Sequence, residues 1–330
     1  MLRAVRIWLF GGVLAMGVFV FALTAGSVAL DFSQVVGALT GGDTGAAADI
    51  VLKLRLPRAL AAFSVGALLA LAGVLLQTLM RNPLAEPYLL GVSGGAAVGA
   101  LGAMLAGAAA LVVHAGAAVG ALAAGACVLS LGRRDLDDEI EAGGGQRLLL
   151  SGIALASVTG AVIALMLSIA PEAQLRGMLF WLIGDLAGAG DWRPAWMVLF
   201  VALVLIFPQA RGLNVLARGE LVAASLGVHV RNLRLIAIVV AAVATAAAVA
   251  TAGTIGFVGL VAPHMLRLAI GNDQRILLPA SALAGGVLVL LADTLARTVM
   301  APVQLPTGAV MALIGAPVFF LMLWRQDHGR

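Results

Sequence analysis

The sequence predicts an all-α polytopic membrane protein, with about ten transmembrane helices in a single domain over residues 1–330. Of the 330 residues, 62% are hydrophobic and only 11% are charged. The mean hydropathy is +1.09, and a soluble domain of this length would need far more charge to cover its surface. The apolar residues also form runs of roughly 20, the length that a helix needs to cross a bilayer core of ~30 Å.

Ten apolar runs, separated by short polar stretches, supply the predicted spans. The first begins after Arg3 and Arg6 and is longer than the apolar core of a typical signal peptide, so we expect an uncleaved first helix. Between spans we expect an outer loop at 31–56, an inner loop at 132–145 and a short inner helix within 210–232. The predicted spans are 7–30, 57–80, 88–110, 111–131, 148–170, 195–209, 233–252, 254–270, 277–300 and 306–324.

The basic residues give an independent test of this topology. With the N-terminus inside and ten alternating spans, 14 of the 20 Lys and Arg residues lie on the inner side and 6 on the outer side. This asymmetry obeys the positive-inside rule and favours an even number of spans, with both termini cytoplasmic. The basic residues are scattered singly at the ends of apolar runs, so we expect them to face a lipid bilayer and no nucleic acid. The six outer residues are Lys53, Arg55, Arg58, Arg176, Arg193 and Arg297.

The sequence offers little from which an enzyme active site could be assembled. The four histidines lack metal-ligand spacing, and no Ser-His-Asp or Cys-His arrangement follows from the order of residues. The only lysine, Lys53, does not follow a glycine-rich turn, so there is no P-loop to bind ATP. The single cysteine, Cys127, lies in an apolar run and is expected to be a core residue. We therefore expect no catalysis, no metal and no cofactor in this chain, and any ATP that drives it must bind another polypeptide.

An ion gradient is the alternative source of energy. Proton- or sodium-coupled carriers keep ionisable groups inside their spans for function, because such groups are costly there. Asp185 and Asp293 are the candidates, and both lie near predicted span ends. Asp293 stands four residues before Arg297, the spacing at which side chains on a helix meet, so a local ion pair is the simplest interpretation. A stand-alone ion-coupled secondary transporter and a scaffold or receptor without transport stay open as alternatives.

Four groups of motifs occur in a fixed order from about residue 50 to the C-terminus. They are Arg55–Arg58 with Gln77–Pro87; Leu90–Gly95; Gly253–His264; and Leu291–Arg297 with Gln304–Gly308 and Ile314–Pro317. In this order and spacing the chain resembles the permease family for iron-siderophores, haem and vitamin B12, the FecCD-type subunits of ABC importers. The resemblance implies a type II ABC importer permease of the bacterial inner (plasma) membrane, working by alternating access as a homodimer. It also implies a periplasmic substrate-binding protein outside and two ATP-binding subunits inside, which would hold ATP and magnesium.

The resemblance assigns docking of the binding protein to Arg55, Arg58 and Arg297, which the family presents to acidic residues on the two lobes of that protein. A guanidinium suits this role because its planar fork pairs bidentately with a carboxylate. The alternative is that these arginines only anchor span ends near lipid headgroups.

The segment at about 213–231 resembles the cytoplasmic coupling helices of the family, which convert movement of the ATPase into movement of the spans. Three leucines offer apolar anchors, and an arginine and a glutamate offer a polar rim. This chain has Leu221 and Val222 where family members often carry an acidic residue and an alanine, so its particular contacts would differ from theirs. An interfacial amphipathic helix is the alternative. The implied coupling residues are Leu216, Arg218, Gly219, Glu220, Leu221, Ser225, Leu226 and Gly227.

A further set of motif residues is assigned to the transport pathway by the resemblance alone. Its glycines would allow close packing or unwound backbone, which a membrane tolerates only where protein buries it or where it lines a cavity. The segment at about 171–194 resembles the short periplasmic gating helix of the family. Tight packing of the glycines and an interfacial role for the tryptophan are the alternatives. The set comprises Asn82, Pro83, Glu86, Gly91, Ser93, Gly94, Trp181, Gly256, Gly259, Pro263 and His264.

The cargo is the least determined part of this interpretation. Within the family, an iron chelate (siderophore or haem) leads as the expected cargo and cobalamin follows. No pair of His or Tyr residues is evident that would select haem.

Overall fold

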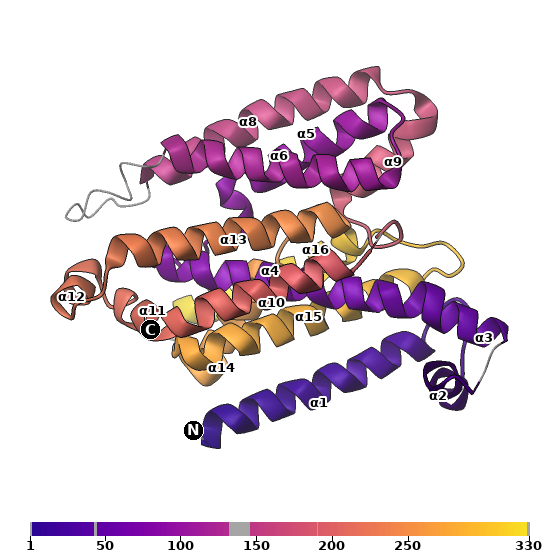
Figure 1. Ribbon diagram of the computed structural model, residues 1–330, viewed down its shortest axis with the longest axis horizontal. Coiled ribbons are helices and arrows are strands. Elements are labelled where there is room, and N and C mark those ends of the chain that lie inside the picture. Colours follow the sequence, from indigo (N-terminus) through magenta and orange to yellow (C-terminus); the bar gives the residue numbers. More distant parts are fainter. Residues whose placement is uncertain (1, 43–44, 132–145, 190, 329–330) are drawn as a thin grey trace.

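The computed structural model describes residues 2–42, 45–131, 146–189 and 191–328. Within these ranges the chain consists of helices joined by loops, with no strand. Most of the long helices run side by side along one axis (Figure 1), as a polytopic membrane protein requires. The predicted inner loop at 132–145 lies outside the described residues.

The helices follow one another along the chain with few long connections. The N-terminal half contains α1 (Leu2–Thr24), α2 (Phe32–Thr40), α3 (Ala46–Asp49), the π-helix η1 (Ile50–Arg55), α4 (Leu56–Leu79), the 3₁₀-helix η2 (Pro87–Leu90), α5 (Val92–Leu105), α6 (Ala110–Leu131) and α8 (Gln146–Ile169). The C-terminal half contains α9 (Glu172–Ile183), α10 (Arg193–Ile206), the 3₁₀-helix η3 (Phe207–Gln209), α11 (Ala210–Leu216), α12 (Glu220–Ser225), α13 (Val230–Ala252), α14 (Val258–Ile270), α15 (Gln274–Thr298) and α16 (Thr307–His328).

The apolar helices correspond to the predicted spans one by one. Each of the ten predicted spans overlaps one of these segments, so the prediction of a polytopic helical membrane protein is confirmed. Among the described residues, seven helical stretches are long and apolar enough to cross a membrane: Ala4–Thr24, Ala46–Leu79, Ala110–Leu131, Leu150–Ile169, Arg193–Leu216, Val230–Ala252 and Gln274–Thr298. Three shorter apolar helices accompany them: Val92–Leu105, Val258–Ile270 and Thr307–Met322.

Two predicted boundaries differ from the structure for local reasons. The span predicted at 88–110 contains only the 14-residue helix α5. Pro87 and the left-handed Gly91 place a separate 3₁₀ turn before this helix, and Gly107, at φ 67°, follows its end. The span predicted at 195–209 instead continues through η3 and α11, because Pro208 falls near the start of a new helical turn, where its missing N–H costs little.

Helix α4 forms the core of the bundle. In its most apolar stretch 94% of the residues are buried, and it packs against α15, α13, α14 and α10. Small residues allow the backbones to approach closely, as is usual where helices meet in lipid. A Cβ on Gly73 would lie 1.9 Å from the carbonyl oxygen of Gly259, and one on Gly66 would lie 2.1 Å from that of Gly285.

A second layer consists of α5, α6 and α8 (Figure 1). Helices α5 and α6 meet through glycines, since a Cβ on Gly95 would lie 2.3 Å from the carbonyl oxygen of Gly120. Cys127 is exposed, so the prediction of a core cysteine is wrong. The buried face of α6 contains Ala117, Ala121 and Val128, and Cys127 lies beside that face rather than on it.

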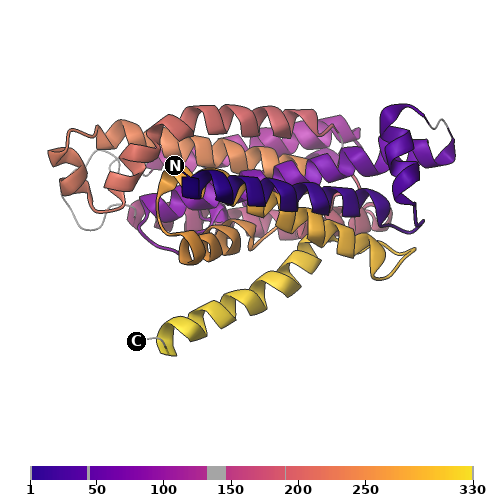
Figure 2. The same cartoon turned by 90° about the horizontal axis from the view of Figure 1, so that it is seen from below.

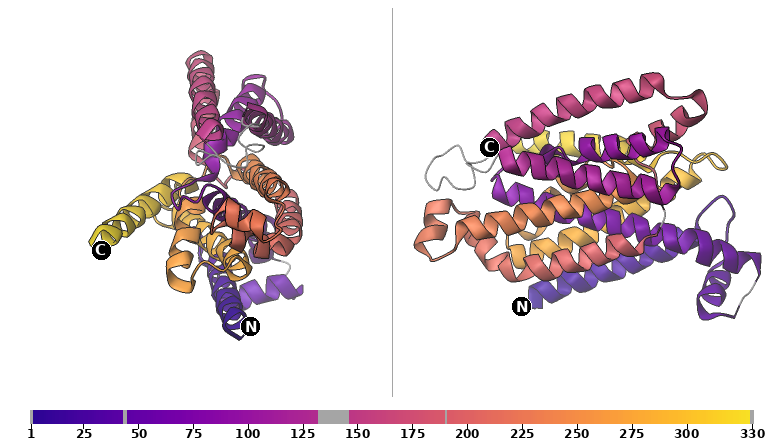
Figure 3. Two further views of the ribbon diagram at one scale, coloured as in Figure 1. Left: turned by 90° about the vertical axis from the view of Figure 1, so that its left-hand side faces the viewer. Right: turned by 45° about the horizontal axis from the view of Figure 1, so that its top comes forward.

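Helices α8 and α16 project from the body of the bundle (Figure 2; Figure 3, left). Only 11% of the apolar stretch of α8 is buried. Helix α16 likewise exposes Leu313, Phe320 and Leu321. These two helices therefore present much of their apolar surface to whatever surrounds the chain.

The two ends of the bundle carry different extramembrane structure (Figure 1). The start of α1, the end of α16 and the short helices α11 and α12 lie at one end, which we call the α12 end. The helices α2 and α3 lie at the opposite end, which we call the α2 end, and they come from the predicted outer loop at 31–56. Both ends of the described chain thus lie on one side, as an even number of crossings requires.

Candidate functional site

At the α2 end a carboxylate lies between two guanidinium groups. The buried Asp293 of α15 receives two short contacts from Arg58 of α4, with Nε 3.0 Å and Nη2 2.8 Å from Oδ1. Gln304 accepts from Nη1 of the same arginine at 2.7 Å, and the hydroxyl of Thr307 donates to Asp293 Oδ1 at 3.1 Å. Three helices, α4, α15 and α16, are therefore joined at this carboxylate.

Arg297 is the second cation at Asp293. Its Nε lies 3.4 Å from Asp293 Oδ2, which confirms the local ion pair predicted from the spacing of four residues. Its Nη2 also donates to the carbonyl oxygen of Ala22, near the end of α1. The stronger partner of Asp293 is nevertheless Arg58, 235 residues away in the chain, which the sequence could not reveal.

Arg55 caps the C-terminal end of α1. Its Nη1 donates to the carbonyl oxygens of Leu23 at 2.7 Å and Thr24 at 2.8 Å, and its Nη2 donates to that of Val28. The last carbonyls of a helix lack intrahelical partners and carry partial negative charge, so a cation there is stabilising. Gly26 makes room for this contact, because a Cβ on it would lie 2.7 Å from Nη2 of Arg55.

Of the three arginines predicted to dock a binding protein, Arg58 and Arg297 thus contact Asp293, and Arg55 contacts the end of α1 that Arg297 also contacts. We call these three arginines and Asp293 the Arg–Asp cluster. In this conformation, however, Arg55 is only 5% exposed and Arg297 only 8%. Both guanidinium groups are used within the chain rather than presented outward. The docking role of the three arginines stays a prediction, and the geometry adds a structural role beside it.

At the α12 end, the predicted coupling segment is a helix–turn–helix. Helix α11 ends at Leu216 and α12 begins at Glu220, with Gly219 between them at φ 128°. This backbone conformation strains any residue other than glycine. Leu221 and Leu226 are 74% and 66% exposed and are free to contact a partner. Leu216 is instead buried inside the chain, and its role in contacting a partner stays a prediction.

Four further coupling residues differ in what they can offer a partner. Arg218, Ser225 and Gly227 are exposed. The Ser225 hydroxyl donates to the Val222 carbonyl oxygen at 3.0 Å. Glu220 is instead held within the chain: it accepts a hydrogen bond from the buried Arg234 of α13 and lies 3.8 Å from Nη2 of Arg81. Glu220 therefore attaches α12 to α13 and to the segment that follows α4, and does not form an exposed rim.

The helix α11 is attached to α15 through a polar contact. Asn214 donates to Asp273 Oδ1 at 2.8 Å and accepts from the backbone N–H of Gln274 at 2.8 Å. Burial alone would raise the pKa of Asp273, but hydrogen bonds from Asn214 and Arg275 outweigh it and hold that pKa below its usual range. Beside α12 lies a groove of about 580 Å³ lined by Glu220, Leu221, His229 and Arg234, among others.

Two of the motif segments, far apart in sequence, pack against each other. Glu86 Oε1 accepts from the backbone N–H of Phe257 at 3.2 Å. The hydroxyl of Tyr88 donates to the carbonyl oxygen of Ile255 and accepts from its N–H, both at 2.9 Å. Phe257 has φ 68°, an uncommon conformation for an aromatic residue, at the break between α13 and α14. Burial raises the pKa of Glu86, and the Phe257 N–H opposes that rise.

The other predicted pathway residues serve mainly as turns and packing positions. Asn82 is exposed, and its Oδ1 accepts from the Leu84 N–H at 2.9 Å, which shapes the turn through Pro83. Gly91 and Gly94 lie against α8, with a Cβ on Gly94 only 2.2 Å from the Thr159 hydroxyl.

The remaining motif positions are half-buried or buried. Ser93 and Gly256 are half-buried, whereas Pro263 and His264 are buried in α14. Gly259 has no room for a side chain, since a Cβ there would lie 2.6 Å from Pro87. Tight packing accounts for most of these positions.

The predicted gating segment joins three helix ends. After α9, the N–H of Asp185 donates to the Ala252 carbonyl oxygen at 2.9 Å, and Gly308 donates to that of Gly184 at 2.9 Å. A Cβ on Gly253 would lie 2.1 Å from the Trp181 carbonyl oxygen. Helix α9 is thus attached by its backbone to the break after α13 and to the start of α16.

Sequence reasoning assigned no role to several residues that the structure makes important. Arg234, Gln77 and Tyr88 all lie in or beside apolar runs, where a polar side chain is costly and signals a partner. Gln77 donates to the carbonyl oxygens of Gly259 and Leu260 at 3.1 and 3.3 Å. Among the residues that the structure describes, no three His, Cys, Asp or Glu side chains gather where they could hold a metal ion.

Comparison with known proteins identifies the family. The model of the FecCD transport family matches residues 14–325. The vitamin B12 import system permease protein BtuC of Shigella sonnei is 42% identical over 285 residues, which is 84% of each chain. The protein of the same name from Salmonella paratyphi A is 43% identical over 284 residues, again 84% of each chain.

Solved structures agree with this match. A metal-chelate type ABC transporter in an inward-facing conformation superposes with a TM-score of 0.84 at 29% identity, covering 98% of this chain and 99% of the other. PsaBC from Streptococcus pneumoniae has a TM-score of 0.55 at 14% identity and shares the fold alone. The chain belongs to the FecCD transport family and is the membrane-spanning permease of an ABC importer.

Proposed function

We propose that this permease imports vitamin B12 or a related corrinoid. The observation that carries the proposal is the identity of 42% and 43%, over 84% of the chain, with permeases that are named for vitamin B12 import. A metal chelate is the second candidate, favoured by the similarity to a metal-chelate type transporter at 29% identity. The motifs of the sequence favour an iron chelate as the cargo. We place cobalamin first, because the identity to the vitamin B12 permeases is higher than the identity to the metal-chelate type transporter.

ABC importer permeases work with ATPase and binding-protein partners. We further propose the complete assembly as two copies of this chain, two ATP-binding subunits and one periplasmic substrate-binding protein. The exposed apolar surfaces of α8 and α16 support a second copy, because such surfaces can pack against an equivalent helix as well as against lipid. In this assembly ATP and magnesium bind the partner subunits, and this chain performs no catalysis.

We propose that the α12 end faces the cytoplasm of a bacterial cell, so that both termini are cytoplasmic in the inner membrane. The positive-inside rule supports this orientation, because Arg81, Arg211, Arg218, Arg231 and Arg275 all come from segments at that end. The α2 end then faces the periplasm and the binding protein.

The proposed mechanism is alternating access driven from the α12 end. ATP binding closes the two ATPase subunits, and they displace α12 through its exposed leucines. The contact between Glu220 and Arg234 passes this displacement to α13, which ends at the junction with α9 and α16. Because that junction is held by backbone hydrogen bonds, movement of α13 changes the position of the gating segment. The cargo arrives on the binding protein and needs no tight site on the permease.

The test is reconstitution of the chain with its ATPase and binding protein in liposomes. ATP-dependent uptake of cobalamin would be compared with uptake of ferric siderophore and of haem. Uptake of cobalamin alone is expected. Uptake of an iron chelate alone would overturn the cargo but not the importer. Flux without any ATPase that follows a proton or sodium gradient would overturn the mechanism, and would direct attention to Asp185 and Asp293.

A further inference from the structure

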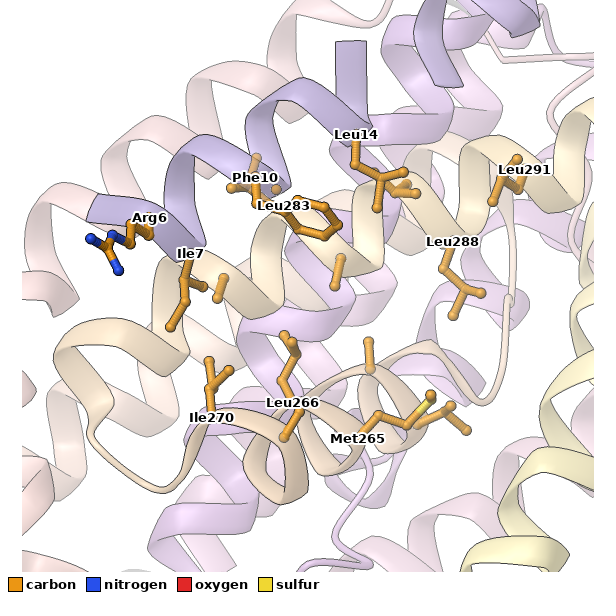
Figure 4. Close-up of a pocket in the computed structure, with 17 residues that line it drawn as sticks. Arg6, Ile7, Phe10, Leu14, Met265, Leu266, Ile270, Leu283, Leu288 and Leu291 are labelled. Atoms are coloured by element: carbon orange, nitrogen blue, oxygen red, sulfur yellow. The ribbon is translucent and has the colours of Figure 1, made fainter. Parts of the chain in front are cut away.

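A long apolar groove lies between α1, α14 and α15, on the outside of the bundle (Figure 4). Its volume is about 560 Å³. Apolar side chains from all three helices line it, and among the described residues that line it only Arg6 is charged. The groove forms because α1 packs on α15 and leaves its other side open, so that Phe10 and Leu14 remain largely exposed.

The groove starts at the α12 end of the bundle and is about as long as one leaflet of the membrane is thick. Figure 4 shows Arg6, Ile7 and Ile270 at one end and Leu291 at the other. The first end lies at the α12 end of the bundle, because α1 starts there and α14 finishes there. The lining residues of α15 run from Ala280 to Leu291, which is ~16 Å of helix. This length is about half of a hydrocarbon core of ~30 Å, or one leaflet.

The charge at the groove's mouth indicates what chemistry it can accept. Arg6 is exposed within the first turn of the span that begins at Ala4, at the depth where lipid headgroups meet hydrocarbon. Its guanidinium points out of the groove, past the last apolar side chains (Figure 4). Within the part of the chain that the structure describes, no carboxylate pairs with Arg6. An uncompensated arginine above a groove of one leaflet's depth matches an anion attached to a hydrocarbon chain.

We propose that this groove, which no part of the importer function requires, holds one acyl chain of an anionic membrane phospholipid, whose phosphate pairs with Arg6. Basic sites between transmembrane helices favour anionic headgroups in this way. The acyl chain lies along Ala284 and Leu288 of α15 and fills the space that α1 leaves open against α14. The lipid then stabilises α1, which packs mainly on a single neighbouring span, α15.

The test uses the purified full-length chain in detergent, exposed to equal amounts of phosphatidylglycerol and phosphatidylcholine with identical acyl chains. Native mass spectrometry counts the lipids that each chain retains. The unaltered chain is expected to retain phosphatidylglycerol preferentially. Arg6→Gln is expected to lower that preference about fivefold, the effect of one basic residue near a membrane surface. Arg211→Gln, at the same end but outside the groove, is the matched control and should leave the preference unchanged.

A second pair of variants separates the groove from the headgroup. Ala284→Phe fills the groove and is expected to abolish retention of both lipids, whereas Ala115→Phe, on the exposed surface of α6, is expected to have no effect. Unchanged lipid preference in Arg6→Gln, or unchanged retention in Ala284→Phe, would overturn the proposal. So would an interchain disulfide formed in membranes by Phe10→Cys in a Cys127→Ser background, because a second copy would then occupy the groove.

Discussion

The two ends of this permease use their charged and apolar residues in opposite ways. At the α2 end, the charges of the Arg–Asp cluster are largely buried and are paired inside the chain, so that the cluster joins α1, α4, α15 and α16. At the α12 end, the one buried ion pair among the described residues only secures α12, and large apolar side chains are left exposed. The α2 end therefore holds helices together, whereas the α12 end keeps surface available for a partner. Four predictions test this contrast, from the largest effect on stability to the smallest.

Removing the carboxylate of the Arg–Asp cluster should have the largest effect. Asp293→Ala leaves the buried guanidinium of Arg297 and the half-buried guanidinium of Arg58 without a counter-ion, which costs about 3–5 kcal/mol. We expect a large fall in the melting temperature of the detergent-solubilised protein. Asp191→Ala removes the partner of Arg193 at an exposed ion pair, and it should not change the melting temperature measurably. Equal behaviour of the two variants would remove the contrast between buried and exposed charges at this end.

Breaking the ion pair at the α12 end should have an intermediate effect. Glu220→Ala leaves the buried guanidinium of Arg234 unpaired and is expected to cost about 2 kcal/mol. ATP-driven uptake should fall more than stability does, because α12 loses its attachment to α13. The exposed Glu172→Ala on α9 serves as control for loss of a carboxylate. Normal uptake by Glu220→Ala would show that this attachment does not transmit movement.

Removing the cap of α1 should cost less. Arg55→Gln withdraws the cation from the carbonyl oxygens of Leu23, Thr24 and Val28, at a cost of about 1 kcal/mol. This variant distinguishes a capping role of Arg55 from a docking role, because loss of a cap lowers the melting temperature, whereas loss of a docking contact lowers only the affinity for the binding protein. If Arg55 serves only docking, the melting temperature is unchanged and only affinity for the binding protein falls. Lys53→Gln, an exposed neighbour paired with Asp49, is the matched control.

Shortening the exposed leucines should change stability least. The double variant Leu221→Ala and Leu226→Ala alters two largely exposed side chains, so its stability should change by less than about 0.5 kcal/mol. Its affinity for the ATPase, measured by co-purification, should nevertheless fall at least about tenfold if the two side chains anchor that partner. Val204→Ala, exposed on the apolar surface of α10, should leave the affinity intact. Unaltered affinity in the double variant would contradict the proposed role of this surface.

The spans could be predicted from sequence because their determinant is local. A run of apolar residues of sufficient length is visible in the sequence whatever surrounds it, and every predicted span corresponds to an apolar helix. The ion pair of Asp293 and Arg297 was equally accessible, because both residues lie on one helix four positions apart. The failures arose where the answer depends on packing between distant segments.

Leu216 and Leu221 show this limit at the α12 end. Both are leucines in one short polar segment, yet the first is buried and the second is exposed, because α11 packs on α15 while α12 extends beyond it. Likewise Arg55 and Arg58 stand three residues apart, but one caps α1 and the other pairs with Asp293. The resemblance marked these residues as important without indicating which partner each would find.

The length of the helical stretch containing α4 has a mechanical consequence. Ala46–Leu79 forms 34 residues of continuous helix, ~51 Å in length, against a hydrocarbon core of ~30 Å. Arg55 and Arg58 lie in the first half of this rod, and the segment after its last residue places Arg81 beside Glu220. If this long helix tilts about its buried middle, its two ends move in opposite directions. In the proposed assembly, a force that the ATPase applies to one end of this helix would reach the other face of the membrane through continuous helical backbone.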